Sequence, residues 1–515
     1  MNKMTSQKRT KETKVLPSLS SFPSVKCFFV LSFSLFALHC NAQIQQAWVA
    51  HYNNNLPAGN HQALKLALDS LGSPIICGFS QNTNGGTGYA VVKYAPNGAQ
   101  PWCSRLDTTN SIQNKPTAFA INSSNNIVVT GNAGTVEYDS NGIQLWTTSY
   151  NALDISLDAS NNVFLCGFGT NFEVAKLSAI GSNAWSRTYT DLGSTVSQAL
   201  TRDASGDVYV AGSDVFYSDR TGNYQQLLIV KFDGEGNRLW VETDAYGSMF
   251  ASVQVSGMQV GGDGGICVLH NLVGIDTLPY TLCKRSADGT FLWVAFNPIN
   301  RSSAATGVAV ARSGAICVTG MQIYGPLYWH SSSFGTYGLG STGAYTWTNN
   351  YPSAMPSTLS AGLGVVSDAS DHFYVTGYSD SGAGHYDIVT IAYDTNGKQL
   401  WLQRYDGAAH LDDVGNAIAV DNNGNVYVAG YETVAGGGTE MVLIKYAPVT
   451  VQKQTGGVLL QAQGSPNEPF DIRATTNLTS WSDLATTNAD ANGLLQYLDT
   501  NAQLYPWRFY LAIPQ

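Results

Sequence analysis

Residues 415–447 read GNAIAVDNNGNVYVAGYETVAGGGTEMVLIKYA, and this segment gives the clearest indication of the fold. Its apolar runs at 417–420, 426–429 and 442–446 are short enough to be β-strands and too short to be helices. The first two runs are separated by Asp421-Asn422-Asn423-Gly424, in which Asp and Asn bond their own backbone and Gly allows a positive φ. The stretch therefore predicts short antiparallel strands joined by tight turns.

The same unit recurs along the chain. Seven tryptophans stand four residues after a glycine, at spacings of 39 to 55 residues: Gly98/Trp102, Gly142/Trp146, Gly181/Trp185, Gly236/Trp240, Gly289/Trp293, Gly343/Trp347 and Gly397/Trp401. Between them recurs an apolar strand that ends in glycine, as in VYVAG, and the unit around Cys267 is a degenerate eighth copy. Four short strands per repeat of about 50 residues are typical of a propeller blade. We therefore predict an all-β, eight-bladed β-propeller, with seven blades as the alternative if one degenerate unit is an insertion.

The two ends of the repeat region complement each other. The last unit stops at Ala447 without a tryptophan strand, whereas residues 46–52 (QAWVAHY) resemble the tryptophan strand at 144–150 (QLWTTSY). A propeller leaves no open sheet edge when its first strand completes its last blade. The sequence therefore predicts that the N-terminal strand closes the ring.

These units resemble the bacterial β-propeller repeats called SBBP repeats, in which a GNVYVTG-like strand precedes an apolar strand ending in lysine. That lysine is present as Lys93, Lys176, Lys231, Lys284 and Lys445, over a region of about residues 46–447. The second unit departs from the pattern with Glu137, and the sixth has the glycine-rich strand FGTYGLG. The resemblance implies the fold and export, and the family has no agreed activity.

The N-terminus has the pattern of a secretory signal peptide at residues 1–42. Six basic residues precede the apolar run 27–38, and Cys40-Asn41-Ala42 places small residues before a cleavage site. Removal of this segment moves the net charge from −10 to −15. We therefore expect a secreted, periplasmic or cell-surface protein, without membrane insertion after cleavage and without a nucleic-acid partner.

The pattern changes after the repeats. We expect the β-propeller at 43–448, a linker at 449–457 and a small C-terminal β-sandwich-like module at 458–515. The segments ATTNLTSW (474–481) and WRFY (507–510) resemble a module that ends many exported bacterial proteins. Such a module serves attachment, export or stabilisation of the propeller.

No set of residues predicts catalysis, a cofactor or a metal site. The histidines lack metal-binding spacing, and the chain has no Gly-x-Ser-x-Gly elbow and no adjacent cysteine pair of the kind that quinoprotein dehydrogenases carry. The recurring turn aspartates (Asp69, Asp158, Asp203, Asp263, Asp368 and Asp421) are expected to act as turn residues, since calcium needs six to eight oxygens. The cysteines are expected to be buried hydrophobic residues, with a Cys267–Cys283 disulfide as the alternative.

These features favour a scaffold that binds a glycan or a protein partner. The alternatives are an extracellular carbohydrate-active enzyme and a quinoprotein-like oxidoreductase. Binding residues usually lie in loops on a rigid scaffold. The loop of unit six is rich in aromatic residues that suit stacking on sugar rings, and it predicts a ligand site made of Tyr324, Tyr328, Trp329, His330 and Phe334.

Overall fold

The computed structural model describes residues 31–32, 43–107, 112–189, 195–218, 222–244, 252–273, 280–298, 303–324, 331–351, 359–380, 382, 384–477, 479–505 and 507–515. Within these residues the regular structure is β-strand, apart from the 3-10 helix η1 (Ala502–Leu504). The prediction of an all-β chain is confirmed. The signal-peptide prediction concerns residues that, except for 31–32, lie outside the described part of the chain.

Seven sheets contain four consecutive antiparallel strands each. The first three sheets are β3 (His61–Leu68), β4 (Pro74–Gln81), β5 (Thr87–Lys93) and β6 (Trp102–Leu106); β7 (Pro116–Ile121), β8 (Ile127–Gly131), β9 (Thr135–Tyr138) and β10 (Gln144–Thr148); and β11 (Asp154–Leu157), β12 (Val163–Cys166), β13 (Phe172–Leu177) and β14 (Asn183–Tyr189). The next two are β15 (Thr195–Arg202), β16 (Val208–Ser218), β17 (Gly222–Phe232) and β18 (Arg238–Asp244); and β19 (Ser252–Val260), β20 (Ile266–Val273), β21 (Thr281–Arg285) and β22 (Phe291–Phe296). The last two are β23 (Ser303–Val310), β24 (Ile316–Tyr324), β25 (Ser331–Leu339) and β26 (Tyr345–Tyr351); and β27 (Ser360–Ser367), β28 (Phe373–Asp380), β29 (Tyr386–Tyr393) and β30 (Gln399–Tyr405).

A further sheet joins the two ends of the repeat region. It contains β31 (Asp413–Val420), β32 (Val426–Thr433) and β33 (Thr439–Gln454), and its fourth strand is β2 (Gln43–Tyr52) from the beginning of the described core. The register places Trp48 opposite Lys445, as Trp185 is opposite Lys176 in an interior sheet. The predicted pairing of the N-terminal strand with the last repeat is confirmed.

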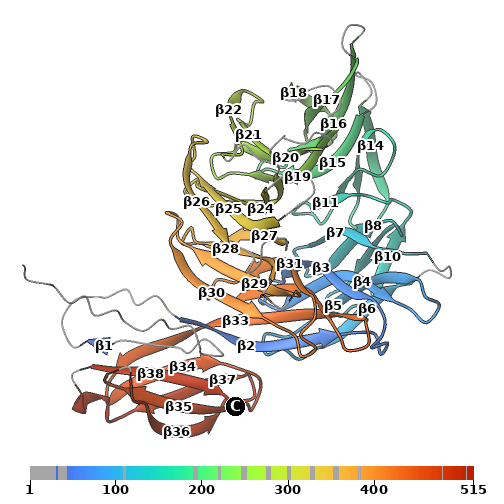
Figure 1. Ribbon diagram of the computed structural model, residues 1–515. Helices are drawn as coiled ribbons and strands as arrows, with labels where there is room; N and C mark the ends of the chain where they lie inside the picture. The colour runs from blue at the N-terminus through green and yellow to red at the C-terminus, as the bar shows by residue number, and fades with distance from the viewer. Residues whose placement is uncertain are drawn as a thin grey trace, which may run out of the picture.

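The sheets follow one another around a common centre (Figure 1). The first strand of each sheet contacts the first strand of the next, in the order β3, β7, β11, β15, β19, β23, β27 and β31, and β31 contacts β3. Apolar clusters lie between successive sheets and form the core. The tryptophan strands, such as β10, β18 and β30, lie at the rim (Figure 1).

The Gly-x-x-x-Trp spacing connects neighbouring sheets. Each indole lies against the repeat glycine of the next sheet, where a Cβ would meet the ring, and its N–H donates to the carbonyl two residues before that glycine. The pairs are Trp48/Gly98, Trp102/Gly142, Trp146/Gly181, Trp185/Gly236, Trp240/Gly289, Trp293/Gly343 and Trp347/Gly397. These glycines have φ values from 77° to 90°. The turn therefore also requires a residue that can adopt the left-handed region of backbone conformation. The repeat thus encodes a contact between blades.

The glycine that ends each VYVAG-like strand has a different role. In β31 the register shifts between Gly415 and Ala417, which marks a β-bulge opposite Gly430. A Cβ on Gly430 would overlap the carbonyl oxygen of Val414 on that bulged strand. Equivalent overlaps would occur at Gly78, Gly212, Gly320 and Gly377. The glycine is therefore required because the bulge brings two backbones together.

We expect Gly430→Ala to lower the free energy of unfolding by about 3 kcal/mol, because the added methyl forces two paired backbones apart. Urea denaturation measures this change. Gly424→Ala is the comparison, because Gly424 has open space around its Cβ position and its only demand is a positive φ of 77°. It should cost only about 1 kcal/mol of conformational strain. Equal losses for the two variants would contradict the role assigned to the bulge.

Four of the five repeat lysines, Lys93, Lys176, Lys231 and Lys284, form ion pairs with aspartates of the repeat turns. Lys93 contacts Asp69 at 2.9 Å, and Lys231 lies 2.9 Å from Asp207 and 3.3 Å from Asp203. The Oδ1 of Asp69 also accepts bonds from backbone N–H groups two and four residues further on. The expected role of these aspartates in turns is confirmed by the same pattern at Asp158, Asp368 and Asp421.

The cysteines of the described residues are free, and five of the six are buried. Cys267 packs into the cluster shared with β23 and β24, whereas Cys283 packs into the cluster shared with β16 and β17. The two thiols thus point to opposite faces of one sheet, which is why they form no disulfide. Their interpretation as buried hydrophobic residues is confirmed.

The C-terminal segment forms a separate hydrophobic core below the ring (Figure 1). Its strands are β34 (Gly457–Gln463), β35 (Pro469–Thr475), β36 (Ser482–Asn488), β37 (Leu494–Asp499) and β38 (Trp507–Pro514). β33 pairs with β34, which pairs with β37, while β35 lies between β36 and β38. β38 also pairs with β1 (Leu31–Ser32).

The interval expected as a linker, 449–457, is mostly strand. β33 runs without interruption from the ring to Gln454, and a two-residue turn then leads into β34. Val449 is buried in the core of the C-terminal module and Val451 packs against it, so the alternating apolar residues continue the strand. One strand therefore belongs to both parts of the molecule.

Candidate functional site

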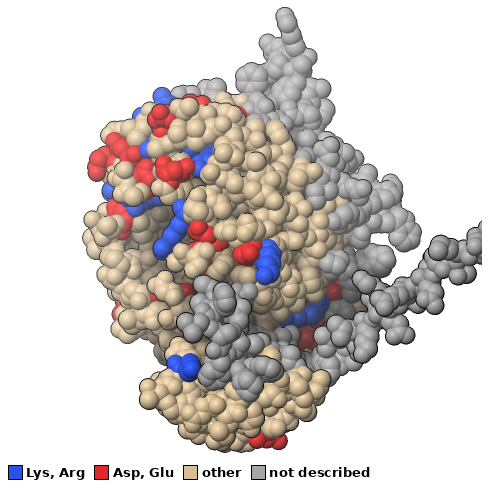
Figure 2. Space-filling model, turned by 90° about the vertical axis from the view of Figure 1, so that its left-hand side faces the viewer, with Lys and Arg blue, Asp and Glu red and all other residues tan. Residues whose placement is uncertain are grey.

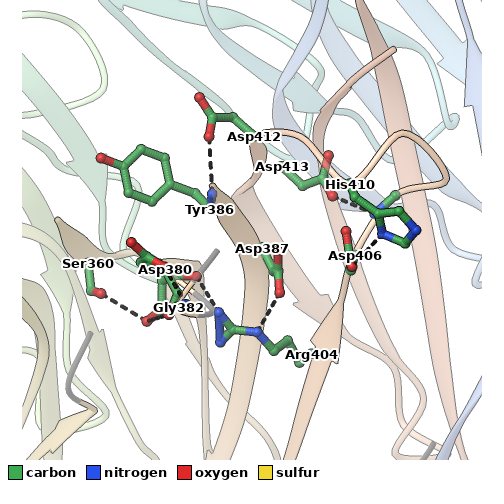
Figure 3. A network of polar contacts seen from close by, with 12 residues as sticks. Ser360, Asp380, Gly382, Tyr386, Asp387, Arg404, Asp406, His410, Asp412 and Asp413 are labelled. Atoms are coloured by element: carbon green, nitrogen blue, oxygen red, sulfur yellow. Dashed lines mark hydrogen bonds and ion pairs between the residues drawn. The ribbon is translucent and has the colours of Figure 1, made fainter. Parts of the chain in front are cut away.

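Acidic side chains gather where the sheet β27–β30 meets the sheet that contains β31–β33 and β2. We call this region the closing seam. Figure 3 shows Asp380, Asp387, Asp406, Asp412 and Asp413 there, together with Arg404 and His410. On the face drawn in Figure 2, by contrast, uncharged residues cover most of the surface of the C-terminal module.

Three carboxylates of the seam converge. One oxygen each of Asp387, Asp406 and Asp413 lies within 4.8 Å of the other two. Asp387 belongs to β29, Asp406 follows β30, and Asp413 begins β31. Asp413 is fully buried and Asp387 is 4% exposed, whereas Asp406 is exposed. The group therefore opens to solvent on the Asp406 side.

Each of these carboxylates accepts a hydrogen bond from a nearby donor. Arg404 Nε lies 2.6 Å from Asp387 Oδ2, and His410 Nδ1 lies 2.8 Å from Asp406 Oδ2. Asp413 Oδ2 accepts a bond of 2.5 Å from the backbone N–H of Gly407. Asp413 Oδ1 is buried and has no hydrogen-bond partner among the described residues.

The pKa values reflect the small number of hydrogen-bond donors around the buried carboxylates. Burial, together with the charge of Glu432, raises the pKa of Asp413 to about 7, although the backbone N–H groups of Gly407 and Thr433 oppose the shift. Burial also raises the pKa of Asp387, although the Arg404 guanidinium opposes the shift. A raised carboxyl pKa means that the folded protein stabilises the negative charge less well than water does.

A second group lies next to the first. His51 Nδ1 lies 3.1 Å from Glu440 Oε1 and 3.4 Å from Glu432 Oε1. Glu432 pairs with Asp413 in the β31–β32 register and accepts a hydrogen bond from the Tyr405 hydroxyl. The hydrogen bond to Glu432 raises the pKa of His51. The imidazolium therefore compensates part of the acidic charge of the seam.

A pocket of about 430 Å³ lies beside His51. It is lined by His51, Tyr52, Asn53, Asn54, Asn55, Gln100, Cys103 and Arg105, which come from β2, the segment after it and the β5–β6 region. Arg105 is fixed by Asp107 at 2.6 Å and by the carbonyl of Ser80 at 3.0 Å. The wall of this pocket is thus a set of planar amide, guanidinium, imidazole and phenol groups.

A larger pocket of about 610 Å³ lies where the ring meets the C-terminal module. Most of its wall is repeat turns, such as 95–97 and 421–425, together with Lys445 and Gln463. The Lys445 ammonium donates to Gln463 Oε1 at 2.7 Å and to the carbonyl of Pro96 at 3.0 Å. The wall is therefore made mostly of residues that the fold itself requires.

The predicted aromatic site has a mixed outcome. Phe334 is fully buried in the cluster between β25 and the sheet β27–β30, so its ring is a core residue. Tyr324 is the last residue of β24. Tyr328, Trp329 and His330 lie outside the described residues, and their role stays a prediction.

The arrangement favours binding over proton transfer. The carboxylate with the most perturbed pKa, Asp413, is fully buried and has no access to a substrate. The accessible groups are amides, a guanidinium and carboxylate oxygens, which suit hydrogen bonding and cation coordination. Sequence patterns alone did not predict this group, because its members come from separate segments of the chain.

No helix in the described part of the chain is long and apolar enough to cross a membrane.

The β-propeller repeat family SBBP matches residues 404–431. No curated protein matches the chain significantly. The solved structures that are similar at low identity include the following three. A protein of unknown function from Dyadobacter fermentans shares 10% identity, with 79% of this chain and 99% of that one covered and a TM-score of 0.40. A protein of unknown function from Bacteroides caccae shares 12%, with 53% and 83% covered and a TM-score of 0.31. Puromycin hydrolase shares 12%, with 74% and 60% covered and a TM-score of 0.41.

Proposed function

Residues 404–431 match the β-propeller repeat of the SBBP family, and on this basis we propose that the chain is an exported, non-catalytic propeller that binds a glycan in the pocket beside His51. The proposal includes eight blades, a cleaved signal peptide at 1–42 and a secreted or cell-surface location. In this proposal the C-terminal module caps the ring through β33.

The observation that carries the proposal is the pocket beside His51. Sugars are recognised by planar polar side chains that form several hydrogen bonds, together with an aromatic ring. Asn53, Asn54 and Asn55 place three consecutive amides on its wall, and Tyr52 adds a ring. The three asparagines lie outside the repeated turn and strand motifs, so the repeat architecture does not account for them, whereas Tyr52 occupies the repeat position of Tyr150.

The backbone of this segment also favours a built recognition site. Asn54 and Asn55 both have a positive φ, of 51° and 57°. The side chain of Asn54 is anchored by a bond from Nδ2 to the carbonyl of Gln81 at 3.1 Å, and Asn53 Oδ1 accepts the N–H of Asn55 at 3.1 Å. This anchoring holds the amides in place before a ligand arrives, which lowers the entropic cost of binding.

We expect Asn55→Gly to weaken glycan binding roughly tenfold, which corresponds to the loss of about one hydrogen bond to the ligand. Glycine removes the side chain while keeping the positive φ of this position. A glycan array identifies the ligand, and calorimetry measures the affinity of residues 43–515. Asn467→Gly, at a φ of 63° in the C-terminal module, is the matched control and should bind normally.

The same array separates the pocket from the aromatic loop predicted from the sequence. A variant with Tyr328→Ala and Trp329→Ala should keep its affinity if the pocket is the site. Loss of binding in that variant alone would place the glycan on the loop instead. If the intact protein binds no glycan, the proposal fails, and a protein partner becomes the next ligand class to test.

A further inference from the structure

The closing seam contains a buried negative charge that the described side chains do not neutralise. Asp413 is fully buried, and among the described residues no Lys, Arg or His nitrogen lies within 4.0 Å of its carboxylate. Its Oδ2 accepts the Gly407 N–H, and its Oδ1 has no hydrogen-bond partner among those residues. A buried, unpaired carboxylate oxygen is costly, so its presence indicates a missing counter-charge.

Neighbouring carboxylates increase the uncompensated negative charge around Asp413. Glu432 is 5% exposed and its charge acts on Asp413, as does that of Asp387. A Cβ on Gly407 would lie 3.0 Å from Glu432 Oε2 and 3.1 Å from Asp413 Oδ2, so the glycine backbone is held between two carboxylates. Arg404 and His410 each serve a different carboxylate of the group.

The geometry of the group suits one cation. Figure 3 shows Asp387, Asp406 and Asp413 around a common space. Their oxygens lie within 4.8 Å of one another, and ligands of a single Ca²⁺ at 2.3–2.6 Å can be up to about 5 Å apart. Mg²⁺ binds its ligands at 2.0–2.1 Å and keeps most of its waters, so it fits this spacing less well. Zn²⁺ favours nitrogen and sulfur ligands, which this group does not offer.

We propose that Asp387, Asp406 and Asp413 form a calcium site that connects the last two sheets of the ring. Asp387 and Asp413 supply oxygens from the interior, and the ion enters from solvent past Asp406 and His410. Water completes the coordination shell on that exposed side. The site is independent of glycan binding, because none of its three ligands lines the pocket beside His51.

The full protein is first treated with EDTA to remove bound metal. Thermal unfolding and calorimetry with added ions then test this proposal. We expect CaCl₂ at 10 mM to raise the Tm by roughly 3 °C, and MgCl₂ to raise it less. Calorimetry should show about one Ca²⁺ per chain. The Asp406→Asn variant should have the wild-type Tm in EDTA, because Asp406 is exposed, and should lose the calcium-dependent rise.

Glu235→Gln, which removes an exposed acidic group far from the seam in the sequence, is the matched control and should respond to calcium like the wild type. Asp413→Asn keeps the shape of the buried side chain and should also lose the response. The proposal is overturned if calcium produces neither a heat of binding in calorimetry nor a change in the Tm of the wild type. It is also overturned if Asp406→Asn keeps the full response, or if magnesium produces an equal one.

Discussion

Replacement of Trp48 by alanine is expected to lower the free energy of unfolding by about 3–5 kcal/mol, the range for loss of a buried tryptophan. Trp48 is 4% exposed and shares a cluster with β3–β5 on one side and with β32–β33 on the other. Its indole N–H donates to the carbonyl of Pro96 at 3.0 Å, and its ring lies against Gly98. The variant loses the contact through which the first strand connects the last sheet to the first.

Trp146→Ala provides the comparison. Trp146 makes the same contacts within the ring, with Ala179 and Gly181, but it is only half-buried. We expect a smaller loss for this variant, because less apolar surface returns to water. Urea denaturation followed by tryptophan fluorescence and circular dichroism measures both. If the two variants lose equal stability, the contact of Trp48 at the ring closure contributes no more to the free energy of unfolding than the equivalent contact of Trp146.

The second large effect concerns pH and Lys445. This side chain is 2% exposed, and burial lowers its pKa to about 8, against a weaker opposing effect of Asp421. In unfolded chains a lysine has a pKa of about 10.4. Between these two values the unfolded chain binds a proton that the folded protein has released, so stability rises with pH in this range.

We expect the unfolding free energy of the wild type, relative to Lys445→Met, to increase by about 2 kcal/mol between pH 8 and pH 10. Denaturation curves at intervals across this range measure the difference. Lys231→Met is the control, because ion pairs with Asp203 and Asp207 stabilise the Lys231 charge. The hydrogen bond that its ammonium donates to Asp207 raises the pKa of Lys231 in spite of burial. If the stability difference between the wild type and Lys445→Met does not change with pH, the lowered pKa of the buried Lys445 is contradicted.

The contrast between the two lysines has a structural cause. Lys231 and Lys445 occupy the same position in their repeats, and both lie opposite a tryptophan. At Lys445, however, the C-terminal module brings Gln463 to the ammonium group, so a neutral amide oxygen takes the place that carboxylates have around Lys231. The sequence places both lysines in one series, and only the packing of β34 separates them.

The sequence predicted the strand order well because the same turn and strand motifs recur in each repeat and can be compared with one another. Turn residues such as Asp421 and Gly424 mark each hairpin, and the missing tryptophan strand of the last unit is found at Trp48. The i, i+4 spacing of Gly142 and Trp146 did not indicate that each contacts a neighbouring sheet. Such contacts depend on how successive sheets stack, and a periodic pattern within one unit does not record this.

The candidate site was much harder to predict. Asp387, Asp406 and Asp413 come from one sheet, the segment after it and the next sheet, so no fixed spacing indicates that they converge. The burial of Phe334 was missed for a related reason. An aromatic residue in a polar, glycine-rich strand has no periodicity that distinguishes the core face from the solvent face.

The pairing of β2 with β33 also determines when the molecule can finish folding. The bond between His61 and Thr439, beside this pairing, joins residues 378 positions apart. Closing a loop of that length costs about 5 kcal/mol of chain entropy, whereas hairpins within each repeat close at little cost. Sheets can therefore form one by one as the chain emerges, while the opening strand waits for the last repeat. Until then both edges stay unpaired, and this open intermediate is the species most exposed to aggregation.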